Sequence, residues 1–162
     1  MGVDIHMHIY KDGEILEKDI FDGRNSEWFG NMQKEGWDNE YDHLPVHYDF
    51  PDGFPKDLVE RYTRENGYYG QCYIKVEDFI KWFIKYRPDL KAGWATTYEK
   101  WQYEKKGEIP EDLPIALPSD ANINDMHFIE YENIWDCSKW LVDFLIDHAI
   151  PDDAYICYCF DH

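Results

Sequence analysis

The chain has 162 residues, a formal net charge of −18 at pH 7 and a calculated pI near 4.5. Its hydrophobic content of 44%, with 18% aromatic residues, suffices for a buried core and excludes a disordered acidic tail. The negative field repels nucleic acid and anionic membranes. We therefore expect a single domain over residues 1–162, with no direct nucleic-acid binding and no membrane attachment.

The sequence contains no apolar run of the roughly 20 residues that a membrane-spanning helix needs. It also lacks a basic segment followed by an apolar one near its beginning, so we expect no secretory signal. None of the four cysteines is in Cys-x-x-Cys spacing, which favours reduced thiols over a structural zinc site. These features predict a cytoplasmic protein.

The N-terminal third of the chain predicts a hairpin followed by a short helix. Residues 3–10 alternate between apolar and polar side chains, as a β-strand with one buried face does. Asp12-Gly13 is typical of a tight turn, so a second strand over 15–21 is expected to pair back. A helix from Asn25 or Ser26 to Lys34 and a long loop over 35–54 follow.

The middle of the chain predicts three helices. Pro55 suits the first turn of a helix that ends near Asn66, with Leu58, Val59 and Tyr62 facing inward. The other expected elements, in chain order, are a turn at Tyr68-Tyr69-Gly70, a short extended piece over 72–74, a helix over 76–84 that Pro88 stops, and a helix over 94–105 with a buried stripe of Trp94, Tyr98 and Trp101.

The C-terminal third completes the predicted sheet. Residues 108–124 are expected to be a loop, 126–132 a strand, 135–148 a helix and 154–160 the last strand. His148 near the end of that helix is interpreted as a structural histidine that the helix dipole favours. Together the elements predict an α+β fold: one small mixed or antiparallel sheet that includes the N- and C-terminal strands, packed against about four to five helices.

The polar face of the first strand is the main candidate for a functional site. Asp4, His6, His8 and Tyr10 share that face, and two histidines at i and i+2 can turn their rings toward a common point. Three interpretations stay open: a polar face that meets solvent or a partner, a ligand-binding site, and a metal site. In the metal alternative His47, from the long loop, completes a divalent-metal shell with His6 and His8; no cofactor is certain.

Two resemblances bear on this strand. Asp4-Ile5-His6-Met7-His8 resembles the Asp-x-His-x-His segment on the first barrel strand of amidohydrolases, in which both histidines bind a catalytic metal. A chain of this length cannot close a barrel of eight βα units. The opening Met-Gly-Val-Asp-Ile-His resembles a family of small, uncharacterised bacteriophage and prophage proteins that commonly begin Met-x-Cys-Asp-Ile-His.

The similarity to the phage family spans most of the chain. It continues through Arg24-Asn25, the segment 53–58 and the final Phe160-Asp161, and it departs where the family often has Glu at Tyr10 and a Ser/His-rich segment at 70–73. The resemblance implies a phage or mobile-element setting, with the host-cell cytoplasm as the location, and no activity. The residues that it carries over are Asp4, His6, Arg24 and Asp161.

Three functional hypotheses follow, and whether the protein is an enzyme stays open. The first is a non-enzymatic phage-type accessory protein, with a counter-defence role, that binds a host protein or a small nucleotide-like ligand. Its pocket would be walled by Asp4, His6, His8 and Tyr10, with Arg24 available for a phosphate or carboxylate. The second is a small metal-dependent hydrolase that uses the Asp4, His6 and His8 face. The third is an acidic nucleic-acid mimic that inhibits a DNA-binding host enzyme. A homo-oligomer is an open alternative for the assembly.

Overall fold

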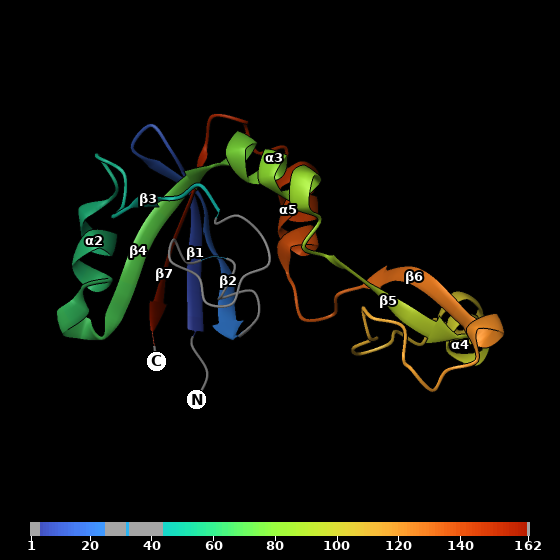
Figure 1. The fold of residues 1–162 in the computed structure, drawn as a ribbon. Coiled ribbons are helices and arrows are strands. Elements are labelled where there is room, and N and C mark those ends of the chain that lie inside the picture. The colour runs from blue at the N-terminus through green and yellow to red at the C-terminus, as the bar shows by residue number, and fades with distance from the viewer. Residues whose placement is uncertain (1–3, 25–31, 33–43, 162) are drawn as a thin grey trace.

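The computed structural model describes residues 4–24, 32 and 44–161, and the structural statements below concern these residues. They form an α+β fold, as predicted. The larger sheet has five antiparallel strands in the order β2-β1-β7-β4-β3, so the N- and C-terminal strands lie side by side (Figure 1). A second sheet, of strands β5 and β6, is a feature that the sequence analysis did not predict.

The predicted N-terminal hairpin is confirmed. Strand β1 (Asp4–Lys11) pairs antiparallel with β2 (Glu14–Arg24), which extends three residues beyond the predicted end. Asp12 and Gly13 both have positive φ, at 49° and 87°. Two successive residues of this kind twist a two-residue turn in the same sense as the strands that it joins.

The rest of the large sheet differs from the prediction near its edge. Strand β7 (Tyr155–Asp161) lies between β1 and β4 (Tyr68–Lys75), and β3 (His47–Tyr48) forms the edge inside the predicted long loop. The turn predicted at 68–70 is wrong, because these residues belong to β4 and Gly70, with φ 67°, sits in an irregularity of the ladder. The predicted helix over 25–34, apart from Met32, and residues 35–43 of the loop lie outside the described residues.

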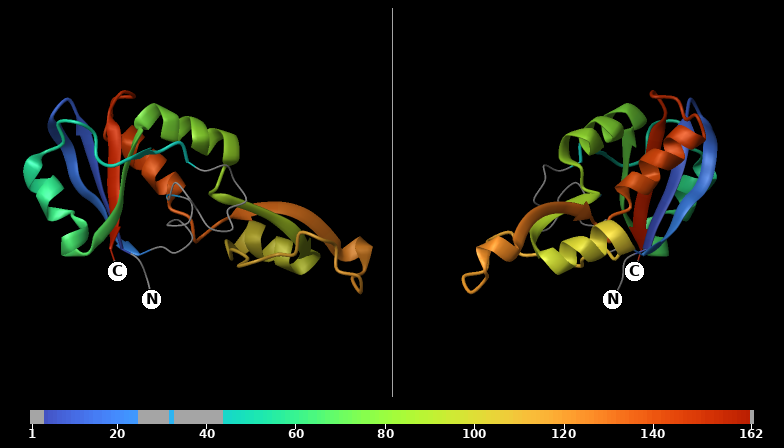
Figure 2. Two further views of the ribbon diagram at one scale, coloured as in Figure 1. Left: turned by 60° about the vertical axis from the view of Figure 1, so that its left-hand side comes forward. Right: turned by 90° about the vertical axis from the view of Figure 1, so that its right-hand side faces the viewer.

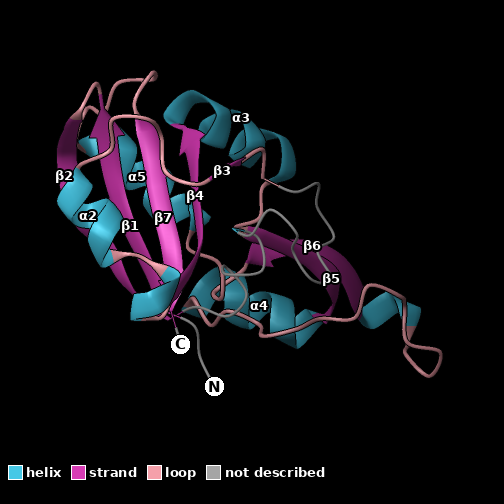
Figure 3. Ribbon diagram, turned by 90° about the vertical axis from the view of Figure 1, so that its left-hand side faces the viewer, coloured by secondary structure: helices cyan, strands magenta, loops and turns pink. Residues whose placement is uncertain are grey.

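Helices cover both faces of this sheet, as the views in Figure 2 and Figure 3 show. Helices α3 (Val76–Tyr86) and α5 (Ser138–Asp147) pack on one face, which carries the larger core. Both helices are confirmed, although α5 begins three residues later than predicted. Members of this core from the sheet and the two helices include Ile5, Met7, Ile9, Ile74, Phe79, Phe83, Leu141, Leu145, Ile156 and Phe160.

Helix α2 (Lys56–Arg61) packs on the opposite face and is shorter than predicted. The chain leaves the helix at Tyr62, makes a 3-10 turn over Arg64–Asn66 and turns into β4 through Gly67, whose φ is 90°. Leu58 and Tyr62 are buried, as expected, whereas Val59 is exposed and its predicted inward orientation is wrong. A helix of fewer than two turns has only a narrow buried face.

The second sheet and one helix form a projecting unit, residues 90–132, which we call the arm (Figure 1). It consists of β5 (Leu90–Thr96), α4 (Thr97–Lys106), a loop with a 3-10 turn at Ile123–Asp125, and β6 (Met126–Glu132). The helix predicted from residue 94 is therefore wrong at its start, and Tyr98 and Trp101 are exposed rather than buried. Thr96 caps α4 reciprocally with Glu99, which fixes its first residue.

In the described part of the chain, no helix combines the length and apolarity needed to cross a bilayer.

Candidate functional site

The polar face of β1 is covered by protein rather than by solvent. Helix α2 and the segment that precedes it pack a small second core over this face. The core consists of Tyr10, Phe54, Leu58, Tyr62, Cys157 and Cys159. Because successive β-strand side chains alternate, Cys157 and Cys159 share the face of β7 that continues the polar face of β1. His8 and Tyr10, two of the predicted site residues, therefore lie beneath a packed layer.

His8 is a buried structural histidine with both ring nitrogens bound. It is 1% exposed, its Nδ1 accepts the backbone N–H of Asp19 at 3.0 Å, and its Nε2 lies 3.0 Å from Tyr62 Oη. Since Nδ1 accepts, the neutral ring carries its proton on Nε2 and donates it to the tyrosine. Burial lowers the pKa of His8, with Asp19 opposing that shift. A metal or ligand would have to displace one of these two hydrogen bonds.

The bond to His8 depends on an irregularity in β2. Asp19 has a positive φ of 51°, and the pairing of β1 with β2 shifts register between Met7 and Ile9. A bulge of this type turns a backbone group out of the ladder, which here directs the Asp19 N–H at the imidazole. Burial raises the pKa of Tyr62 to about 12, so its hydroxyl stays protonated at neutral pH.

Tyr10 is also buried, and its hydroxyl is bound on both sides. The oxygen accepts the Gly13 N–H at 2.9 Å and lies 3.3 Å from the Asp52 carbonyl, to which it donates. These bonds join the β1–β2 turn to the segment before α2. Tyr10 therefore holds the hairpin against the second core.

The other three predicted ligand residues lie together at the end of the sheet where both termini emerge. The ladder places Arg24, Asp4, Asp161 and Tyr68 opposite one another across four strands, and His6 follows Asp4 on the same face. We call these five residues the terminal cluster. Asp4, His6 and Arg24 belong to this cluster, whereas the buried His8 and Tyr10 lie further along β1 and do not.

Two contacts organise the terminal cluster. His6 Nε2 lies 3.0 Å from Asp161 Oδ2, and Arg24 Nε donates to Asp4 Oδ1 at 2.7 Å. The His6 ring meets the edge of Tyr68 with centroids 5.3 Å apart. Arg24 is 60% exposed in its side chain, whereas His6 is 11% exposed. The cluster thus has a solvated cationic side and a more enclosed side formed by His6, Asp161 and Tyr68.

One oxygen of this cluster is left without a partner. Asp161 Oδ1 is buried and accepts no hydrogen bond from the residues that the structure describes. Buried acceptors are nearly always satisfied in native proteins, so an exception calls for a specific explanation such as a ligand or a water molecule. The arrangement can therefore receive a hydrogen-bond donor beside two carboxylates.

His47 does not join His6 and His8. It lies on β3 and stacks on Tyr73, with ring centroids 4.9 Å apart. The ladder runs from His47 through Tyr73 and Cys157 to His8, so three strand spacings, about 14 Å, separate the two histidines. Over the described ranges, no three His, Cys, Asp or Glu side chains gather as metal ligands.

Sequence reasoning named Asp161 through the family resemblance and as a hydrogen-bond partner of a structural His6, and it missed Asp19, Tyr62 as a polar partner, and Tyr68. A signal for Asp161 existed, because pairing of the two terminal strands brings the end of β7 beside the start of β1. The role of Tyr62 depends on where α2 packs, which no local pattern specifies. Comparison of the chain with protein-family models, curated proteins and solved structures found no match.

Proposed function

We propose that the terminal cluster binds a small nucleotide-like ligand and that the protein is a non-enzymatic accessory protein of a phage or mobile element. The observation that carries the proposal is the buried Asp161 Oδ1, which lacks a donor among the described residues and lies one strand away from Asp4. Leaving a buried acceptor unsatisfied costs about 1–3 kcal/mol. A ligand that supplies an N–H group to this oxygen recovers that energy.

The neighbouring side chains fit the other parts of such a ligand. Arg24 is bound to Asp4 through Nε, and its two terminal nitrogens can form the paired hydrogen bonds that phosphate oxygens accept. Tyr68 presents a half-buried ring beside His6, and an aromatic ring of this kind can pack against a base. A carboxylate, a guanidinium and an aromatic ring in one row match a base that carries amino groups and a phosphate.

The hydrolase hypothesis receives less support from the same geometry. His8 already uses both ring nitrogens within the protein, and His47 lies three strands away from it. Of the three histidines proposed to hold a metal, His6 alone belongs to the terminal cluster. We therefore take binding, not metal-dependent hydrolysis, as the proposed function.

Calorimetric titration of the full chain with adenosine, guanosine, cytidine and uridine monophosphates and their 3′,5′-cyclic forms tests the proposal. We expect one-to-one binding of at least one nucleotide. Asp161→Asn should weaken that binding at least tenfold, because it removes the negative charge and leaves one acceptor oxygen where the carboxylate offers one to His6 and one to the ligand. The matched control is Asp147→Asn, at the exposed end of α5 on the other side of the sheet.

Absence of binding by all eight nucleotides at millimolar concentration would overturn the proposal. So would equal affinities of the Asp161→Asn variant and the unmodified chain. Chromatography of the nucleotide after incubation separates binding from turnover, because a non-enzymatic protein returns the nucleotide unchanged.

A further inference from the structure

Among the described residues, the two-stranded sheet of the arm has one buried face and one face that is partly exposed. Tyr103 of α4 and Leu113 of the following loop pack on the inner face, against Ala95, Ile129 and Tyr131. Gly93 belongs to this face, and a Cβ atom there would lie 2.6 Å from the Leu113 Cβ, so the packing is close. The inner face is therefore the core of the arm.

The opposite face, which we call the outer face, carries two aromatic side chains, of which Phe128 is exposed and Trp94 is half-buried. Trp94 and Phe128 are cross-strand neighbours in edge-to-face contact, with ring centroids 5.3 Å apart, and Phe128 is 53% exposed. Alternation along the two strands defines the residues of the outer face. They are Leu90, Ala92, Trp94, Thr96, Met126, Phe128, Glu130 and Glu132.

Two carboxylates share this face with the apolar side chains, within an acidic part of the arm. The segment from Glu108 to Glu132 contains seven acidic residues and no lysine or arginine. Glu130 and Glu132 stand on the outer face itself, and both are exposed. Two cations that act on these glutamates are bound to other carboxylates: Arg87 binds Asp89 at 2.8 Å, and Lys139 binds Asp143 at 2.9 Å.

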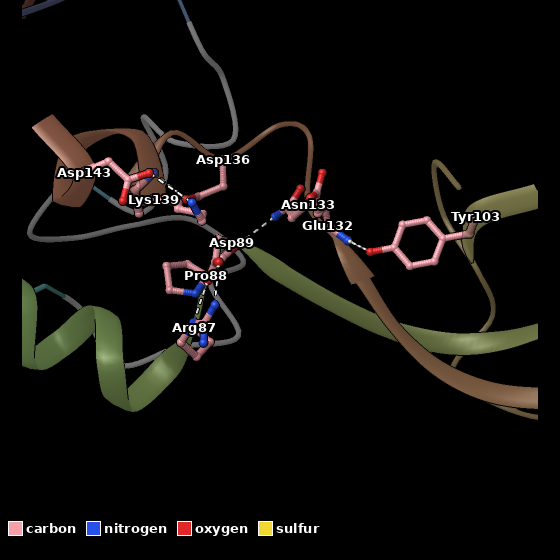
Figure 4. Close-up of polar contacts among 10 residues, drawn as sticks. Arg87, Pro88, Asp89, Tyr103, Glu132, Asn133, Asp136, Lys139 and Asp143 are labelled. Atoms are coloured by element: carbon pink, nitrogen blue, oxygen red, sulfur yellow. Dashed lines mark hydrogen bonds and ion pairs between the residues drawn. The ribbon is translucent and has the colours of Figure 1, made fainter. Parts of the chain in front are cut away.

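Two segments, residues 87–89 and Asn133, connect the arm to the part of the chain that holds the large sheet, and we call them the neck (Figure 4). The buried Asn133 donates its backbone N–H to the Asp89 carbonyl at 2.7 Å and its side-chain N–H to the Pro88 carbonyl at 3.1 Å. Arg87 makes a two-pronged ion pair with Asp89, at 2.9 and 2.8 Å. The two segments that connect the arm to the large sheet are thus hydrogen-bonded to each other. This restricts the position of the outer face and lowers the entropy cost of binding a partner.

We propose that the outer face of the arm docks a basic protein surface, namely an amphipathic helix with lysine or arginine beside apolar residues. The exposed Phe128 with the half-buried Trp94 beside it supplies the kind of aromatic contact that carries much of the energy in protein interfaces. Glu130 and Glu132 attract a basic partner, and the net charge of −18 repels a second copy of this chain. The same charge opposes nucleic acid and anionic lipid as the occupant.

The test measures binding of two synthetic 18-residue helical peptides to the full chain by fluorescence anisotropy. One peptide combines leucine on one face with lysine on the other, and the second replaces each lysine with glutamate. We expect the lysine peptide alone to bind, more weakly as salt rises. Phe128→Ala and, separately, the double variant Glu130→Gln/Glu132→Gln should each weaken binding at least fivefold.

Tyr98→Ala is the matched control, because Tyr98 is an exposed aromatic residue of the arm on α4. It should leave the affinity within twofold. The double glutamine variant keeps the proposal testable if Phe128→Ala perturbs the arm. Failure of the lysine peptide to bind would overturn the proposal, as would affinities that neither variant changes. Sedimentation that reveals a dimer abolished by Phe128→Ala would assign the face to a second copy instead.

Discussion

Asp4 and Asp161 stand directly opposite each other on neighbouring strands, although they come from the two ends of the chain. Like charges in this position destabilise a sheet. Each carboxylate has its own partner, since Arg24 donates to Asp4 and His6 lies at hydrogen-bond distance from Asp161. The terminal cluster therefore balances carboxylate repulsion against one ion pair and one histidine contact.

This balance predicts that Arg24→Gln destabilises the protein by about 0.5–1 kcal/mol, because the exposed ion pair is lost and the two carboxylates face each other. Adding Asp4→Asn should return most of that stability by removing the repulsion. Urea unfolding of the two single variants and the double variant measures the coupling. If the double variant is no more stable than Arg24→Gln, repulsion between the carboxylates is not significant.

The buried bond between His8 and Tyr62 predicts a larger effect. Tyr62→Phe removes the acceptor for His8 Nε2 without changing the shape of the ring, and we expect a loss of about 1–3 kcal/mol. Tyr98→Phe is the control, because Tyr98 is exposed and should change stability by less than about 0.5 kcal/mol. Equal stabilities of the two variants in urea unfolding would show that His8 does not depend on this bond.

The sequence specified the polar face of β1 but not what covers it. Strict alternation predicted the strand, and Asp12-Gly13 predicted the turn, because both signals are local. The burial of His8 and Tyr10 depends on α2, and the position of α2 on the sheet is a tertiary property. The alternation therefore identified Asp4 and His6, and the family resemblance added Arg24, but neither distinguished these residues from structural ones such as His8.

The arm shows where helical spacing misleads. Trp94, Tyr98 and Trp101 fit one helical stripe, yet Trp94 belongs to β5 and the other two are exposed on α4. The Thr96 and Glu99 pair is the local signal that places the start of the helix correctly. Aromatic residues can be spaced as on the buried face of a helix even when they are exposed, so spacing alone does not predict burial.

A pH dependence follows from His8. Burial lowers its pKa in the folded protein below the ordinary value of 6.5, so the unfolded chain binds a proton that the folded chain does not. The stability that this causes is present above about pH 6.5 and is lost as the pH falls below that value, by up to about 1.4 kcal/mol per pH unit.

Unfolding in urea at pH 7.5, 6.5 and 5.5 measures this dependence. His8→Gln, which cannot titrate, should have a smaller decrease in unfolding free energy between pH 6.5 and 5.5 than the unmodified chain, whatever its stability at pH 7.5. Because the comparison is between slopes, other titrating groups contribute equally to both proteins. Identical slopes would mean that His8 is protonated as readily in the folded state as in the unfolded state.

The hydrogen bond from Asn133 in the neck leads us to expect a substitution that destabilises the protein at neutral pH and less so at acidic pH. Asn133→Asp retains the oxygen that accepts the Trp135 N–H but replaces the donor to the Pro88 carbonyl. At neutral pH the substitution places a buried carboxylate against a carbonyl oxygen, and we expect a loss of about 1–3 kcal/mol in the free energy of unfolding. Protonation of the new carboxyl restores a donor, so the difference from the unmodified chain should shrink as the pH falls from 7 to 5.

Hydrogen exchange of the backbone amides of β5 and β6, with β1 and β7 as the internal reference, locates the effect. Faster exchange confined to the arm, and smaller at pH 5 after correction for intrinsic rates, is the expected result. Uniform acceleration across both sheets would show instead that the neck stabilises the whole protein rather than the arm.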